Sequence, residues 1–209
     1  MIPELFRLGG VFMWPLLVFS LAALTIICDR IIFFAVHRLK IEELERPLME
    51  ALREGRLAEA AAGLAAGAGR NLGARVLSAL AGHARLDSVQ LEKALRAEAE
   101  SCVNSLEAGF NFLAAIGSLA PLTGFLGTVS GMIGAFRSIA EAAEVTPRIV
   151  AGGIYEALIT TVFGLIIAIV SLSAYYILDG VVDRFTVSAE RICSRFITAL
   201  SERGSGEQA

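Results

Sequence analysis

Three long apolar runs stand out along the chain of 209 residues. They extend over residues 8–28, 108–136 and 149–178, and Glu156 is the one charged residue inside them. A transmembrane helix needs about 20 apolar residues to cross the bilayer core. Each run is long enough, so the pattern predicts three transmembrane helices.

The first run has two interpretations. Ser20 and Ala22 resemble the small residues of a cleavage site, which would make this run a secretory signal peptide. Glu4 lies in the N-terminal segment, and the apolar run is longer than the apolar region of a signal peptide. We therefore expect a transmembrane helix that leaves the bilayer at Asp29 and Arg30.

The helical pattern continues beyond the second and third runs. It extends without a break from Ser88 to Phe136, over 49 residues. Such a helix would be ~74 Å long, whereas the bilayer core takes only ~30 Å. Thr146 and Pro147 resemble the N-cap and first residue of a helix that continues to about Leu200. We expect two very long antiparallel helices that project into the cytoplasm.

The polar stretch between the first two runs predicts shorter helices. Segments 41–54, 56–66 and 71–85 each end in or near glycine or polar residues. Asp87 then resembles an N-cap, with Gln90 as its capping-box partner. These helices predict a cytoplasmic helical bundle.

The distribution of lysine and arginine gives the orientation. Eleven of the 18 basic residues lie between residues 29 and 107, and four lie after residue 178. Arg7, Arg137 and Arg148 fall on the other side. Cytoplasmic segments carry the excess of positive charge. We therefore expect a multi-pass protein with a periplasmic N-terminus and a cytoplasmic C-terminus.

The predicted fold class is all-α integral membrane, with three transmembrane helices, the second and third of which extend into the cytoplasmic bundle. The expected parts are an N-terminal segment with the first transmembrane helix at 1–36, a cytoplasmic helical region at 37–107, a second transmembrane helix at 108–136, a short periplasmic loop at 137–148, a third transmembrane helix at 149–178, and a cytoplasmic helix extension with a disordered tail at 179–209.

Composition narrows the function classes. The chain is 56% hydrophobic and 19% charged, whereas soluble domains average about 45–50% and 25%. A formal charge of −3 argues against a strongly basic nucleic-acid binder. The three cysteines form no CxxC motif, and the sequence offers no nucleophile–base pair, phosphate loop or metal cluster. We expect neither an enzyme nor a cofactor or metal.

Glu156 is the main candidate for chemistry. A charged residue at the middle of a bilayer costs ~2.5–3.5 kcal/mol or more, so such residues usually face a bundle interior or a wet cavity and mark an ion route. The alternative is a structural glutamate near the outer interface, either neutral or paired with Arg148 two helical turns away.

Hydroxyls lie at similar expected depths. Glu156 is ~12 Å below Arg148, and Thr128 is ~13 Å below the opposite end of the antiparallel helix. Thr160 and Thr161 form a deeper level. Hydroxyls beside an acid suit a proton or hydrated-ion path, although Ser and Thr in transmembrane helices often bond their own backbone carbonyls. Thr160 shares the helix face of Glu156, and Thr161 lies ~140° away.

Small residues follow one face of each later run, and such faces allow close approach of helices in membranes. Packing is the expected role of the glycines, and Glu156 shares their face. The expected packing residues are Gly124, Gly127, Gly131, Gly153 and Gly164.

The segments 120–136 and 153–165, with their glycine, threonine and glutamate pattern, resemble the ExbB/TolQ/MotA family of ion-conducting, motor-like subunits of bacterial inner membranes. Asp29-Arg30 is similar to the acidic–arginine pair that commonly ends the first span of this family. Three expected spans rather than four favour the ExbB/TolQ branch over flagellar MotA.

The resemblance implies a homopentamer whose second and third spans line a central pore. It implies a single-span partner of the ExbD/TolR kind in that pore, whose membrane aspartate carries the proton, and a possible TonB/TolA-like partner. The family's polar pore residues correspond to Thr128, Glu156 and Thr161. The resemblance and the helix geometry differ over Thr160 and Thr161, so both stay candidates for the ion pathway.

The function expected from these features is that of a proton-conducting subunit of an inner-membrane motor. It would use the proton motive force to drive a partner that acts on an outer-membrane transport or envelope-integrity system. Two alternatives stay open, namely a Na⁺-driven member of the same family and a structural scaffold or secondary transporter.

Overall fold

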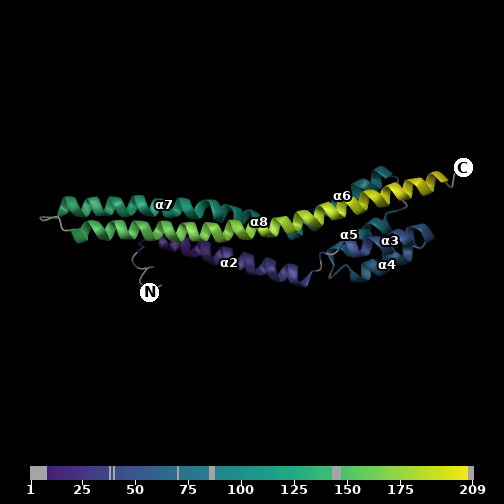
Figure 1. Ribbon diagram of the computed structural model, residues 1–209, viewed down its shortest axis with the longest axis horizontal. Coiled ribbons are helices and arrows are strands. Elements are labelled where there is room, and N and C mark those ends of the chain that lie inside the picture. The colour runs from purple at the N-terminus through teal and green to yellow at the C-terminus, as the bar shows by residue number, and fades with distance from the viewer. Residues whose placement is uncertain are drawn as a thin grey trace. The chain divides into compact units, whose positions relative to one another are not determined.

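The computed structural model describes residues 9–37, 39, 41–69, 71–84, 88–142 and 147–206. The elements of these residues are α-helices, which confirms the predicted all-α fold class (Figure 1). Their bounds are α2 (Met13–Val36), α3 (Glu42–Glu54), α4 (Leu57–Gly67), α5 (Leu72–Gly82), α6 (Ser88–Leu106), α7 (Phe110–Glu141) and α8 (Pro147–Gly206).

Three of these helices are long and apolar enough to cross a membrane. The qualifying segments are Met13–Val36, Phe110–Glu141 and Ala151–Leu200. They confirm the prediction of three spans. The chain divides into two compact units, one made of Met1–Asp29 with Gly109–Ile177 and one made of Arg30–Ala108 with Leu178–Ala209. We call them the membrane unit and the polar unit.

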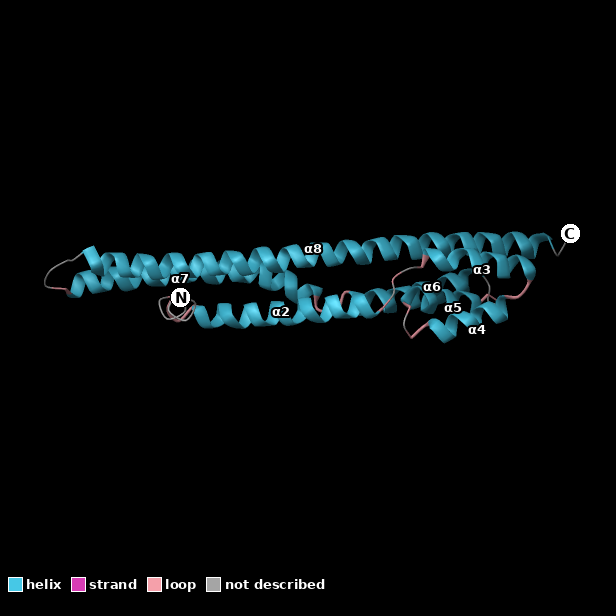
Figure 2. Cartoon of the chain, turned by 60° about the horizontal axis from the view of Figure 1, so that its bottom comes forward, coloured by secondary structure: helices cyan, strands magenta, loops and turns pink. Residues whose placement is uncertain are grey.

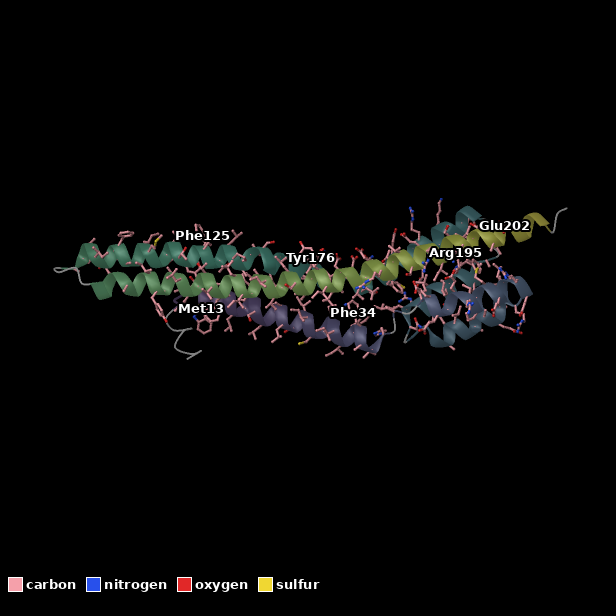
Figure 3. The ribbon with its side chains drawn as sticks, viewed as in Figure 1. Met13, Phe34, Phe125, Tyr176, Arg195 and Glu202 are labelled. Carbon is pink, nitrogen blue, oxygen red and sulfur yellow. The ribbon has the colours of Figure 1, made fainter. Side chains whose placement is uncertain are left out.

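In the membrane unit, α7 lies antiparallel to the first part of α8, side by side in both views (Figures 1 and 2). Small residues of the two helices meet at their interface, whereas large apolar side chains point outward. Phe125, which is 63% exposed, points away from α8 (Figure 3). Such side chains suit contact with lipid or with other subunits, since the bilayer core is as apolar as they are.

The start of α2 also belongs to the membrane unit. Met13 and Leu16 are 3% and 1% exposed, so the first turns of α2 are packed rather than free. A Cβ on Gly9, just before α2, would lie 3.3 Å from Cγ2 of Ile159 on α8. The first span therefore contacts the third at this end.

The prediction of one unbroken helix from Ser88 to Phe136 is wrong. α6 ends at Leu106 and α7 begins at Phe110. Between them, Gly109 has a φ of 87°, which a residue with a side chain adopts only with strain. A Cβ on Gly109 would also lie 2.9 Å from Cγ2 of Ile26. Gly109 thus allows the break between α6 and α7, and it also allows the chain at this point to approach α2 closely.

The third long helix is present as predicted, but it continues beyond Leu200 into the tail that was expected to be disordered. α8 runs as one helix from Pro147 to Gly206, over 60 residues. Thr146, the expected N-cap, lies outside the described residues, as does Asp87, the expected cap of α6. α7 continues to Glu141, so its last turn lies in the range assigned to the loop at 137–148.

The polar unit is held by a core of aliphatic side chains and by charge pairs at its surface. Leu77 and Leu80 of α5 are fully buried, as is Phe196 of α8. Asn71 caps α5 by accepting a hydrogen bond from the Ala74 amide at 3.3 Å. Charged side chains gather on this unit (Figure 3). Among the described residues, the ion pairs that join α3 to α8 include Arg191–Glu42 and Arg195–Glu45, both at 2.9 Å.

Candidate functional site

The predicted packing glycines lie together between α7 and α8. A Cβ on Gly124 would lie 2.8 Å from the carbonyl oxygen of Thr160, and a Cβ on Gly131 would lie 2.9 Å from that of Gly153. A Cβ on Gly164 would lie 2.6 Å from the carbonyl oxygen of Ala120. The obstacles are backbone atoms, which cannot swing aside. The glycines therefore set how closely the two helices approach.

Thr160 is part of this interface. Its side chain is 1% exposed, and its hydroxyl donates to the carbonyl oxygens of Ala157 at 2.8 Å and Gly124 at 3.3 Å. A Cβ on Gly127 would overlap the Thr160 hydroxyl. Thr160 therefore fills the space opposite Gly127 and links α8 to α7.

Thr161 has a different environment. It is half-buried, and its hydroxyl donates to the Gly124 carbonyl oxygen at 3.3 Å. Thr160 and Thr161 thus share one acceptor, but Thr161 keeps part of its surface open. Of the two adjacent threonines, Thr161 is the one with exposed surface.

Thr128 bonds its own helix. It is half-buried, and its hydroxyl donates to the Phe125 carbonyl oxygen at 2.7 Å. This is the local bonding that Ser and Thr commonly adopt in helices. Because Gly127 lies opposite Thr160 and Gly131 lies opposite Gly153, Thr128 lies within about one helical turn of Glu156 along the helix axis.

Glu156 lies on α8 at the side that faces the start of the first span. It is half-buried. A Cβ on Gly10 would overlap its Oε1 atom and would lie 3.0 Å from its Cδ atom. The carboxylate is therefore next to Gly10. The structure thus brings Thr160 and Thr161 to the α7–α8 contact and places the acid against Gly10.

Two features of the membrane unit were not predicted as site residues. Gly10 contacts the acid, and its sequence signal is the Gly9-Gly10 pair at the start of the first apolar run. Ser171 of α8 is fully buried, and its hydroxyl has no hydrogen-bond partner among the described residues. No sequence signal marks this unpaired hydroxyl.

The polar unit holds two cysteines with weakly acidic thiols. Burial raises the pKa of Cys193 to about 11 and also raises the pKa of Cys102.

Arg30, at the cytoplasmic end expected for the first span, donates to the Ser105 carbonyl oxygen at 3.0 Å and lies over the Phe33 ring at 4.9 Å. Within the described ranges, no group of His, Cys, Asp and Glu is placed to hold a metal ion.

Comparison with known proteins gives the family. The model of the MotA/TolQ/ExbB proton channel family matches residues 42–191. The chain is 37% identical over 110 residues to the Tol-Pal system protein TolQ of Pseudomonas aeruginosa, a match that covers 53% of this chain and 45% of that protein. It is 34% identical over 184 residues to the putative biopolymer transport protein ExbB-like 1 of Synechocystis, covering 83% and 68%.

A further relative is the biopolymer transport protein exbB1 of Vibrio cholerae, 33% identical over 107 residues, covering 48% of this chain and 47% of that protein. The chain thus spans less than half the length of the TolQ and exbB1 relatives. The family match and the three apolar helices identify an inner-membrane protein. The resemblance seen in the sequence is confirmed: the chain belongs to the MotA/TolQ/ExbB proton channel family, a family of energy-transducing channel subunits and not of enzymes.

Proposed function

We propose that the chain is the proton-conducting, stator-like subunit of an inner-membrane motor of the ExbB/TolQ kind. Glu156 carries this proposal, because it is the one charged residue in the apolar run of 149–178 and lies half-buried in the membrane unit. An acid is retained in a transmembrane helix at a cost, and it usually marks an ion or proton route.

In this proposal, Glu156 shapes or gates the proton route, and partly exposed hydroxyls hydrate it. Thr128 and Thr161 are both half-buried, so each keeps surface for water. Thr160 is buried between two helices of one subunit and serves packing. Thr161 rather than Thr160 therefore lines the route, in agreement with the position that the family resemblance gives.

The proposed assembly is a homopentamer around one or two single-span partners of the ExbD/TolR kind. The second and third spans line the pore, and a TonB/TolA-like protein receives the motion. The exposed apolar side chains of α7 and α8, such as Phe125 and Leu158, provide surface for neighbouring subunits and lipid. The excess of basic residues at 29–107 and after 178 favours a periplasmic N-terminus and a cytoplasmic C-terminus.

The energy source of the motor is the membrane potential. A charge that crosses the membrane gains ~2.3 kcal/mol per 100 mV. In the proposed cycle, protons that pass Glu156 and the partner's aspartate release this energy, which turns or shifts the partner inside the pentamer. The partner then acts on an outer-membrane transport or envelope-integrity system.

The experiment is reconstitution of the chain in liposomes with and without its single-span partner. A membrane potential and a pH gradient are imposed, and proton flux is followed with a pH-sensitive dye. We expect flux only when both proteins are present. Flux that requires Na⁺ would support the sodium-driven alternative, since stacked hydroxyls also coordinate Na⁺. No cation flux with the partner present would contradict the proposal and favour a structural scaffold.

A further inference from the structure

The first span begins with a two-glycine turn that lies beside Glu156. Gly10 has a φ of 67°, in the left-handed region that favours glycine. A Cβ built on Gly10 would overlap Oε1 of Glu156, and it would lie 3.0 Å from Cδ and 3.6 Å from Cγ of that residue. The Glu156 carboxylate therefore occupies the space that a side chain at position 10 would need.

The turn is anchored on both sides. The amide of Met13 donates to the Gly10 carbonyl oxygen at 3.3 Å, and Met13 itself is 3% exposed. A Cβ on Gly9 would lie 2.5 Å from Cγ of Met13 and 3.3 Å from Cγ2 of Ile159. Ile159 is three residues after Glu156, so both lie on one face of α8. The two glycines therefore contact that face of α8 at adjacent positions. Gly9 lies against the apolar Ile159, and Gly10 lies against the acidic Glu156.

We propose that Gly10 is a positioning residue for the Glu156 carboxylate. Its missing side chain leaves the space in which the acid lies against the start of the first span. This inference rests on the proposed role of Glu156 in proton conduction. It extends the ion route to the first span, which has no other assigned part in it.

The physical consequence of a side chain at position 10 follows from what it would meet. The obstacle is the far end of a flexible glutamate and not backbone. The carboxylate therefore moves while the helices stay in place. The chain still folds, with some strain from the left-handed φ, but its acid is displaced. A displacement of about 1 Å from a productive geometry is enough to cost up to about a hundredfold in rate.

The test uses five variants, each reconstituted with the single-span partner. Gly10→Ala displaces the acid. Glu156→Asp has a carboxylate that is shorter by one methylene and leaves room for a Cβ at position 10. The double variant Gly10→Ala with Glu156→Asp combines them. Gly9→Ala, alone and together with Glu156→Asp, is the matched control, because it alters the same turn but meets Met13 and Ile159 instead of the acid.

We expect Gly10→Ala to lower proton flux by about tenfold to hundredfold. The double variant should recover to the flux of Glu156→Asp alone, whereas Glu156→Asp should not rescue Gly9→Ala. Wild-type flux in Gly10→Ala would overturn the inference. So would a loss of flux in the double variant that equals the product of the losses in the two single variants.

A second readout does not depend on conduction. A hydrophobic carbodiimide labels carboxyl groups in the membrane, and mass spectrometry quantifies the label on Glu156. We expect the labelling rate of Glu156 to change in Gly10→Ala and to stay at the wild-type rate in Gly9→Ala. Equal rates in all three proteins would overturn the positioning role. Wild-type flux in Glu156→Gln would instead contradict the proposed function, and the labelling would still decide whether Gly10 positions the acid.

Discussion

The Thr160 hydroxyl on α8 lies 3.3 Å from the Gly124 carbonyl oxygen on α7, and the Thr161 hydroxyl lies 3.3 Å from the same atom. One carbonyl group of α7 therefore accepts from two adjacent threonines. These threonines differ in exposure, since Thr160 is buried and Thr161 is half-buried. This difference in exposure is the basis for assigning packing to Thr160 and the proposed proton route to Thr161.

Thr160→Val and Thr161→Val should affect different properties. Valine keeps the shape of threonine and removes the hydroxyl, and a lost buried hydrogen bond costs ~0.5–1.5 kcal/mol. We expect Thr160→Val to lower thermal stability more than Thr161→Val does. We expect Thr161→Val to lower proton flux more than Thr160→Val does. Thermal unfolding in detergent and flux in liposomes measure the two effects. The opposite order in flux would assign the pathway to Thr160.

Two glycines of α7 make a matched pair for the packing role. A Cβ on Gly131 would lie 2.9 Å from the Gly153 carbonyl oxygen, whereas a Cβ on Gly134 would meet nothing within 4 Å. Overpacking typically costs ~1–3 kcal/mol. We expect Gly131→Ala to lower the melting temperature in detergent, and Gly134→Ala to leave it nearly unchanged. Equal shifts for both variants would show that the α7–α8 contact does not depend on its glycines.

The polar unit offers a second pair of glycines, for which substitution by alanine should change the stability in opposite directions. A Cβ on Gly73 would lie 2.9 Å from the Cα atom of Ile41, and a Cβ on Gly63 would meet nothing within 4 Å. Gly63→Ala should stabilise the protein by ~0.4–1 kcal/mol, because alanine restricts the unfolded chain. Gly73→Ala should destabilise it, because the neighbouring backbone must move. Circular dichroism during heating measures both, and stabilisation by Gly73→Ala would contradict the packing of α5 on Ile41.

Cys193 should show an unusual pH dependence of alkylation. Burial disfavours its thiolate and raises its pKa to about 11, and the nearby Glu190 acts in the same direction. The thiolate is the reactive form, so its fraction at neutral pH is ~300-fold below that of a thiol with a pKa of ~8.5. We expect the rate at Cys193 to rise about tenfold per pH unit up to about pH 10. Mass spectrometry after treatment with N-ethylmaleimide measures it, and a rate that levels off below pH 9 would contradict the burial of Cys193.

Much of the fold follows from local patterns. The apolar runs specify three spans because only an apolar helix of sufficient length is stable across a bilayer. Gly55 ends α3 in a left-handed conformation with a φ of 75°, as expected from its place after the periodic segment 41–54. The contact of the glycine faces of α7 and α8 also follows, because their spacing places them on single helix faces.

The rest depends on contacts between segments far apart in the chain. The expected continuous helix is interrupted at Gly109, between α6 and α7, and Gly109 lies close to Ile26 of α2, a contact that no local pattern identifies. Similarly, the sequence indicates an acid in the third span but not that its carboxylate lies against Gly10. The different exposure of Thr160 and Thr161 could be seen only from the packing of α7 on α8. In the sequence they are two adjacent residues of the same type at nearly the same expected depth.

The central claim is that the Glu156 carboxylate belongs to the proton route. The most direct measurement compares proton flux of the wild type, Glu156→Gln and Glu141→Gln, each reconstituted with the single-span partner. Glu141→Gln is the matched control, because Glu141 is exposed at the end of α7 and pairs with Arg137 at 2.9 Å. We predict that Glu156→Gln lowers flux by about tenfold or more, as expected for loss of an intramembrane acid on an ion route, while Glu141→Gln conducts like the wild type. Wild-type flux in Glu156→Gln would contradict the claim.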